Sequence, residues 1–462
     1  MMEVFPPGLS TRFLVLRRSI VSADPVEVSP TGMSLHTSGS APFSVMAPPA
    51  ETNSASGMRK PVPITDAAAV SAVAESLSRE EIIAFDTEFL RERTFYPRLG
   101  LLQFADRQNA WLVDPLALSP GDLEPLLGVL TDPKILKAAH AAEQDQECLH
   151  HAYGILAKPL LDTAIAAALT GSGDQIGLGP LLSKLLDIQL PKGHTRTNWT
   201  KRPLPPAMAE YAVGDVKHLV RATDLLLADL DKAGRREWAM TLSAAFADPR
   251  RYEPDPDAIA SRIASGRSAG SVTYAVLREL VRWRENKVRK SDIPRRWVAE
   301  DSVLLSLAKA RPTNLEDLSH FRGFGAKLLQ KEGPAILNAI QRGKDLPPEN
   351  RPTPPRKTQP DGDEAPAVSV LKCFLNLLAR EHKVPARYVI EPDDVIKLLR
   401  GRFRNVGELA DSGLLKPGVS EEIGEALMEV LNGRQALTFS SGRVQYIEVS
   451  TGQTTRQTLS RH

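Results

Sequence analysis

The sequence predicts an α/β domain built on a mixed sheet flanked by helices, followed by two small all-α domains. Short apolar runs alternate with helical periodicity over residues 61–235 and indicate strands and helices in turn. Only helical spacing is found over residues 271–344 and 366–438, and a Pro-rich polar linker at 345–365 separates these two segments. A chain of 462 residues is also too long for one compact core, so several domains are expected.

The order of elements in the first half supports the mixed sheet. Apolar residues at helical spacing predict a first helix over residues 66–78, and a short apolar run predicts a strand over 81–89. The further expected strands lie at 99–104, 110–113, 134–139 and 160–162, and the further expected helices at 123–130, 142–151, 163–169, 178–186 and 205–230. Three strands in succession, followed by alternating helix and strand, indicate a mixed sheet with helices on its faces.

The segments outside these domains are expected to be less ordered. Residues 1–60 are rich in Ser, Pro, Thr and Ala, which is typical of a disordered extension or of a start codon assigned too early. A transit peptide is the alternative for this segment. Residues 236–270 are expected to form a connector, and residues 439–462 a disordered tail.

The composition is that of an ordinary soluble protein without a membrane partner. Hydrophobic residues make up 42% and charged residues 25% of the chain, and the net charge of +2 does not by itself indicate a nucleic-acid binder. No apolar run approaches the roughly 20 residues that span a bilayer. The two cysteines, Cys148 and Cys373, lie far apart and form no metal or redox spacing, which favours a reducing, cytoplasmic compartment.

Four carboxylates are the candidates for chemistry. Asp86 and Glu88 are two apart on an expected strand, so they share a face at the carboxyl end of an apolar run, where open α/β sheets bind ligands. Asp145 lies on the helix after the next core strand, and Asp215 lies on the late helix, one turn after Tyr211. Acids that converge in this way would repel unless cations lay between them, and oxygen ligands suit Mg²⁺ or Mn²⁺. The alternative is that each acid is a solvated surface charge or a helix cap.

Three motifs around these acids resemble the exonuclease motifs of the ribonuclease D family. They are Asp86-Thr87-Glu88-Phe89-Leu90-Arg91, continuing through Thr94, Tyr96-Pro97, Leu99 and Gln103; His140-Ala141 with Asp145; and Tyr211-Ala212 with Asp215-Val216. The intervening segments that match are Leu161-Asp162-Thr163, Arg196-Thr197 with Trp199, and Arg202-Pro203-Leu204. The tyrosine four residues before the last aspartate indicates the tyrosine branch of the DEDD superfamily. Asn198 departs from the aspartate that the family often has before the tryptophan.

The resemblance implies a ribonuclease H-like fold and a metal-dependent 3′→5′ exoribonuclease that releases nucleoside 5′-monophosphates. Two divalent metal ions, Mg²⁺ or Mn²⁺, would be held by the four carboxylates Asp86, Glu88, Asp145 and Asp215, and Tyr211 would orient the attacking water. The implied partners are RNAs, namely tRNA precursors and other small structured RNAs trimmed at their 3′ ends, and the enzyme is expected to be a monomer.

The substrate-binding candidates come from the same motif segments. They are Phe89, Arg91, Tyr96, Gln103, His140, Arg196 and Arg202. Phe89 and Tyr96 could stack on the terminal bases, as aromatic residues do in single-strand binders, and core packing is the alternative for Phe89. His140 ends a strand, so a structural hydrogen bond near the site explains it better than metal ligation does.

Residues 271–344 resemble an HRDC domain, the helical module shared by RecQ-type helicases and ribonuclease D. A basic run in its first helix and a glycine-bracketed turn before a later helix are expected to contact nucleic-acid phosphates, and a solvated face is the alternative for the basic run. The residues expected to make these contacts are Arg282, Arg284, Lys287, Arg289, Lys290, Gly323 and Gly325. Residues 366–438 are interpreted as a second HRDC-like domain, although their turn at 414–418 lacks the aromatic glycine pattern.

Two other functions remain as alternatives. Related catalytic domains accompany RecQ-type helicases, which makes a 3′→5′ DNA exonuclease one alternative. The chain, however, has no Gly-rich phosphate loop that ends in Lys-Ser or Lys-Thr. A non-catalytic RNA-binding adaptor is the other alternative, and the acids present at all four motif positions argue against it.

Overall fold

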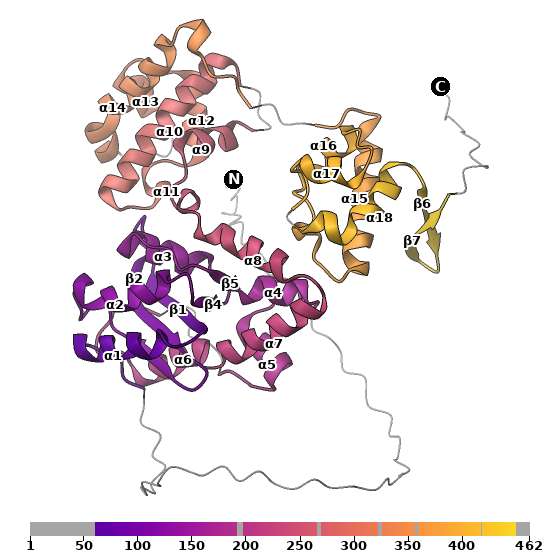
Figure 1. Ribbon diagram of the computed structural model, residues 1–462. Helices are drawn as coiled ribbons and strands as arrows, with labels where there is room; N and C mark the ends of the chain where they lie inside the picture. The colour runs from indigo at the N-terminus through magenta and orange to yellow at the C-terminus, as the bar shows by residue number, and fades with distance from the viewer. Residues whose placement is uncertain are drawn as a thin grey trace, which may run out of the picture. The chain divides into compact units, whose positions relative to one another are not determined.

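A computed structural model of the protein describes residues 61–191, 197–265, 269–321, 326–355, 359–416 and 418–449 (Figure 1). The extension expected over residues 1–60 and the final part of the expected tail, residues 450–462, lie outside these ranges. Within the described ranges, no helix combines the length and the apolar character that crossing a membrane requires.

The first half of the chain forms a five-stranded mixed sheet, which confirms the prediction (Figure 1). The strands are β1 (Ile82–Leu90), β2 (Arg98–Ala105), β3 (Ala110–Val113), β4 (Leu136–Ala139) and β5 (Leu160–Asp162). They lie in the order β3-β2-β1-β4-β5. The pairs β1–β2 and β2–β3 are antiparallel, whereas β1–β4 and β4–β5 are parallel. β1 is therefore central, and its opening apolar run is buried on both faces, as parallel strands usually are.

Helices cover both faces of this sheet. They are α1 (Ala67–Leu77), α2 (Pro120–Thr131), α3 (Glu143–Tyr153), α4 (Thr163–Leu169), α5 (Leu178–Leu186), α6 (Pro206–Lys217), α7 (Leu219–Lys232) and α8 (Arg236–Ala244). Successive side chains of a strand point to opposite faces, so β1 contributes to two cores. Ile83 and Phe85 pack with α1, α2 and α3, whereas Ile82 and Ala84 pack with α4, α7 and α8.

Two segments of this half differ from the expectation. The helix expected over 205–230 is two helices, α6 and α7, because the backbone departs from helical geometry at His218, with φ −111° and ψ 0°. The expected connector at 236–270 contains helices that belong to the flanking cores. In α8, the Ser243 hydroxyl accepts a hydrogen bond from the Asp162 amide at 3.0 Å, and α9 (Pro256–Ala264) packs against the next helix.

The helices α9 to α14 form what we call the first helical unit, residues 256–345. The remaining bounds are α10 (Ser271–Ser291), α11 (Arg295–Val298), α12 (Asp301–Ala310), α13 (Leu315–Ser319) and α14 (Ala326–Asp345). Leu277 and Leu280 of α10 are fully buried in its apolar core, which also contains Ile259 of α9, Leu304 of α12 and Ile340 of α14. The predicted all-α character of this segment is confirmed.

The second helical unit, residues 364–431, follows the Pro-rich segment and ends in a hairpin. Its elements are α15 (Glu364–Glu381), α16 (Val395–Arg400), α17 (Val406–Asp411) and α18 (Val419–Leu431), and the hairpin strands are β6 (Gln435–Ser440) and β7 (Arg443–Glu448). The expectation of a disordered tail is therefore wrong for residues 439–448. Ser441 and Gly442 at the turn both have positive φ, 50° and 73°, and a Ser-Gly pair between two strands is a recognisable hairpin signal.

Candidate active site

Three acids from two distant parts of the sequence meet beside the carboxyl end of β1. One carboxylate oxygen each from Asp86, Glu88 and Asp215 lies within 4.8 Å of the other two. These residues line a cleft of about 490 Å³ together with Asp145 and Tyr211. The structure thus brings together all five residues for which the sequence predicted a catalytic role.

The geometry of β1 explains how Asp86 and Glu88 come to share the cleft. The parallel pairing of β1 with β4 covers Ile82 to Ala84, so the two acids lie just beyond it, near the helix that follows β4. On the other side Asp86 pairs with Gln103 of β2, and the Gln103 amide nitrogen donates to Asp86 Oδ2 at 3.3 Å. The register shifts between Glu88 and Phe89, which is a feature common next to active sites.

Asp145 approaches the same cleft from the first turn of α3. Its side chain is 6% exposed, and its Oδ1 accepts hydrogen bonds from the backbone amide of Thr87 at 3.0 Å and from the Thr87 hydroxyl at 2.5 Å. Thr87 therefore ties the helix that carries Asp145 to the strand that carries Asp86 and Glu88. Sequence reasoning missed this role, because the partner of Thr87 lies 58 residues away and no local pattern marks it.

The acids are strongly perturbed by their surroundings. Burial is the largest cause in each case, and it raises the pKa of Glu88 to about 8, of Asp215 to about 7 and of Asp145 to about 6. Burial, with charge repulsion from the three other acids, also raises the pKa of Asp86 well above its ordinary value. All the donor atoms are carboxylate oxygens, and burial disfavours their combined negative charge. Such a site fits hard divalent cations.

Tyr211 lies one helical turn before Asp215 on α6. A hydrogen bond between the two side chains lowers the pKa of Asp215 and opposes the effect of burial. Burial and the nearby acids raise the pKa of the Tyr211 phenol, so the hydroxyl stays protonated and neutral at physiological pH. The cleft therefore contains a neutral hydrogen-bond donor beside its acids.

Three of the expected substrate-binding residues line the cleft: Phe89, Arg91 and His140. Arg91 forms an ion pair with Glu147 of α3 at 2.7 Å. His140 has a protein partner at each ring nitrogen, with Nδ1 2.9 Å from the Thr163 hydroxyl and Nε2 3.0 Å from the Ile176 carbonyl oxygen. These contacts match the structural hydrogen bonding weighed for His140 from the sequence.

Three other candidates do not line the cleft, and a fourth lies outside the described residues. Gln103 is fully buried and contacts Asp86, so it supports a carboxylate and cannot touch substrate. The Arg202 guanidinium donates hydrogen bonds to Asp114 at 2.7 Å and to the Trp199 carbonyl at 2.8 Å, so its role is structural. The Tyr96 ring lies 4.6 Å from the His151 ring, centroid to centroid, at an interplanar angle of 56°, and it packs against the first helical unit. Arg196 lies outside the described residues.

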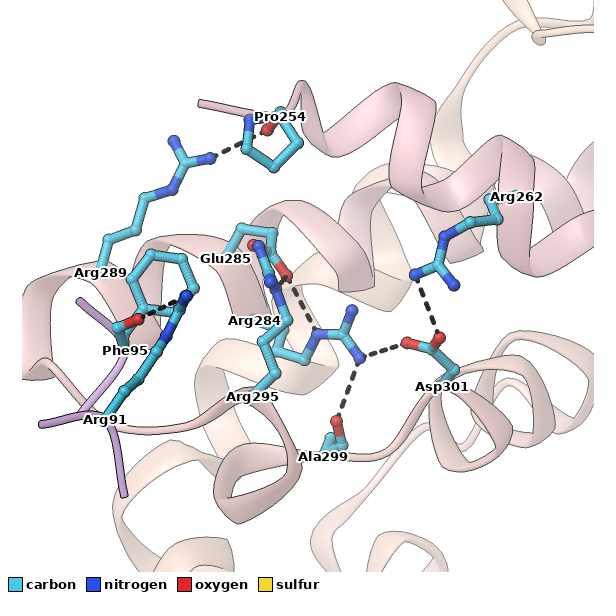
Figure 2. A network of polar contacts seen from close by, with 10 residues as sticks. All are labelled: Arg91, Phe95, Pro254, Arg262, Arg284, Glu285, Arg289, Arg295, Ala299 and Asp301. Carbon is cyan, nitrogen blue, oxygen red and sulfur yellow. Dashed lines mark hydrogen bonds and ion pairs between the residues drawn. The ribbon is translucent and has the colours of Figure 1, made fainter. Parts of the chain in front are cut away.

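Most of the basic run in α10 is neutralised within the protein, and Figure 2 shows the most buried part of it. Arg284 is 1% exposed and bonds Asp301 at 2.7 Å, so the expectation that it contacts nucleic acid is wrong. Arg282 pairs with Asp257 and Glu279, Lys287 pairs with Glu332, and Arg289 donates to the Pro254 carbonyl. Consecutive residues of a helix point in different directions around its axis, so some of these basic side chains face neighbouring helices and others face solvent. Gly323 and Gly325 lie outside the described residues.

Comparison with known proteins gives a consistent set of similarities. Residues 61–231 match the family described as 3′-5′ exonuclease, and residues 274–340 match the HRDC domain family. Ribonuclease D of Gluconacetobacter diazotrophicus is 33% identical over 396 residues, which cover 85% of this chain and 98% of that protein. Ribonuclease D of Zymomonas mobilis is 34% identical over 385 residues, which cover 82% of this chain and 96% of that protein.

A solved structure shows the same similarity at the level of the fold. The crystal structure of Escherichia coli RNase D, described as an exoribonuclease involved in structured RNA processing, matches with a TM-score of 0.70 and 28% identity. The match covers 81% of this chain and 99% of the other.

Proposed function

This chain belongs to the ribonuclease D family, and we propose that it is a 3′→5′ exoribonuclease whose active site is the cleft around Asp86, Glu88, Asp145 and Asp215. The observation that carries the proposal is the convergence of carboxylate oxygens from β1 and α6 within 4.8 Å of one another. In a cleft that is partly buried, such a cluster is stable with cations and repulsive without them.

The four carboxylates would hold two divalent ions, Mg²⁺ or Mn²⁺. When bound, such a pair lowers the pKa of a water molecule and stabilises charge on the attacking and leaving oxygens of an in-line displacement. The protein orients its ligands in advance, because Gln103 holds the Asp86 carboxylate and Thr87 holds that of Asp145.

Tyr211 would orient the attacking water towards the terminal phosphodiester. Its neutral hydroxyl lies beside Asp215, which lets it hold a water molecule without adding negative charge to the cleft. Attack at this phosphodiester would release a nucleoside 5′-monophosphate and a chain that is one nucleotide shorter. Phe89 and Arg91, which line the cleft, would contact the terminal base and a phosphate.

We assign tRNA precursors and other small structured RNAs as substrates, trimmed at their 3′ ends by a monomeric, cytoplasmic enzyme. Support comes from the two helical units that follow the catalytic domain and from the similar RNase D, which is described as acting in structured RNA processing. Lys290 lines a groove of about 540 Å³ between α10 and α14, beside the ion pairs Arg282–Glu279 and Lys287–Glu332, and we take Lys290 as the phosphate contact of the first helical unit.

The deciding experiment compares substrates and metals with the purified full-length protein. A 3′-extended tRNA should be shortened one nucleotide at a time in Mg²⁺ or Mn²⁺ and left intact in EDTA. A single-stranded DNA of matched sequence should be degraded more slowly. Faster digestion of the DNA would favour the DNA exonuclease, and RNA binding without cleavage in any metal would favour the adaptor.

A further inference from the structure

The first helical unit shares its apolar core with a loop at the rim of the cleft. We call residues 91–97, which connect β1 to β2, the rim loop. Its first two residues, Arg91 and Glu92, line the cleft. Phe95, in the middle of the loop, is only 8% exposed because it packs into the core of the first helical unit, with residues such as Leu277 and Leu280.

Polar contacts hold the same loop from the end of α10. Asp292 is the C-cap of α10, and its Oδ1 accepts hydrogen bonds from the backbone amides of Phe95 and Tyr96, both at 2.9 Å. The Arg295 guanidinium lies over the Phe95 ring, 4.8 Å from its centroid. Arg295 is itself fixed by the fully buried Glu285, to which it donates at 2.7 Å (Figure 2).

The contact with Phe95 continues into the cleft. The Phe95 carbonyl accepts a hydrogen bond from Arg91 Nη2 at 2.9 Å (Figure 2). The other terminal nitrogen of Arg91 pairs with Glu147, two residues after Asp145 on α3. The Phe95 amide thus donates to Asp292, and the Phe95 carbonyl accepts from the Arg91 guanidinium.

We propose that Asp292 is a positioning residue for the exonuclease reaction, which makes the first helical unit a structural part of the catalytic cleft. The inference rests on the proposed function of that cleft. From the sequence, the first helical unit was expected only to bind RNA. The contacts of Asp292 with the rim loop are compatible with that role. Through Asp292 it also fixes the rim loop, and through the loop it orients Arg91 towards the 3′ end of the substrate.

Two substitutions separate the hydrogen bonds of Asp292 from its backbone conformation. Asp292 has φ 47°, a left-handed conformation that both Asn and Gly adopt readily. Asp292→Asn keeps an Oδ1 acceptor, whereas Asp292→Gly keeps the conformation and loses the acceptor. Arg311→Gly is the matched control, because Arg311 is also a helix C-cap of the same unit with φ 56°.

The test measures turnover of a trinucleotide RNA and of a 3′-extended tRNA by the full-length protein in Mg²⁺. Because displacement of a positioned group by about 1 Å lowers rates by up to about a hundredfold, Asp292→Gly should reduce kcat by about tenfold on both substrates. Asp292→Asn should recover most of that rate, and Arg311→Gly should match the wild type. Hydrogen exchange at the Phe95 and Tyr96 amides should accelerate in Asp292→Gly alone.

The results that would overturn the positioning role of Asp292 differ from the result that would refute the proposed function. Normal turnover by Asp292→Gly, or equal losses in the Asn and Gly variants, would overturn the positioning role. A loss confined to tRNA would overturn it as well, since it would place Asp292 in RNA holding. A wild-type protein that cleaves neither RNA would refute the proposed function itself, and the exchange measurement would still report on the contact between Asp292 and the rim loop.

Discussion

Removal of divalent ions should make the stability of this protein fall as the pH rises. Without a cation, burial and the neighbouring acids raise the pKa of Glu88 from its ordinary 4.5 to about 8. Between these two values the folded chain keeps a proton that the unfolded chain has already released. The stabilising contribution of Glu88 is therefore complete below about pH 4.5 and is lost as the pH rises through about 8.

The expected loss is large on the scale of a domain. The difference between 4.5 and about 8 corresponds to roughly 5 kcal/mol of unfolding free energy, at about 1.4 kcal/mol for each tenfold change in proton affinity. Whole domains are stable by roughly 5–15 kcal/mol. Asp215, whose pKa is raised to about 7, changes the stability in the same direction. Saturating Mg²⁺ should restore the stability at high pH, because the ion binds the ionised carboxylates of the folded chain.

Urea unfolding followed by circular dichroism, in EDTA and in Mg²⁺ between about pH 5 and pH 8, measures this directly. Glu88→Gln removes one titrating group and should make the metal-free profile less steep, with the remaining slope due to acids such as Asp215. Glu124→Gln, at an exposed position of α2, removes the same charge and should leave the slope unchanged. A metal-free profile that is flat in the wild type, or equally steep in Glu88→Gln, would refute the reasoning.

Asp86→Asn or Asp215→Asn should lower single-turnover cleavage by roughly a thousandfold or more while circular dichroism shows an intact fold, and near-normal turnover would contradict the metal-ligand assignment. Tyr211→Phe keeps the ring and should lower the rate about a hundredfold with little change in RNA affinity; an unaltered rate would mean that Tyr211 only packs. Lys290→Ala should reduce the slope of log affinity against log salt by about 0.7 for single-stranded RNA. Arg284→Ala should leave that slope alone and destabilise the fold by about 3 kcal/mol, because it removes a buried ion-pair partner; equal effects on the slope would show that both residues contact RNA.

Local periodicity explains why much of the candidate active site could be predicted from the sequence. Asp86 and Glu88 share a face because side chains alternate along a strand, and Tyr211 lies beside Asp215 because four residues make about one helical turn. The apolar run before Asp86 likewise predicted a strand, which the structure shows to be buried in the middle of the sheet. The same reasoning failed where a break depended on single-residue geometry, as at His218 between α6 and α7.

Charge and residue type did not reveal what a side chain touches. Gln103, Arg202 and Arg284 were all expected to meet nucleic acid, and each instead supports the protein: one holds Asp86, one clamps Asp114, and one is buried beside Asp301. A long polar side chain reaches several ångströms from its backbone. Its partner is therefore set by the packing of neighbouring elements and not by its own position in a motif.

The sequence by itself determined the mixed sheet, the all-α character of the two helical units and the group of acids that line the candidate active site. Only the tertiary structure decided that Thr87 holds Asp145 and that Asp292 holds the rim loop. These partners are separated by 58 and 197 residues. Periodicity specifies which side chains share a face within one element, whereas contacts between distant elements depend on strand register and on how helices dock.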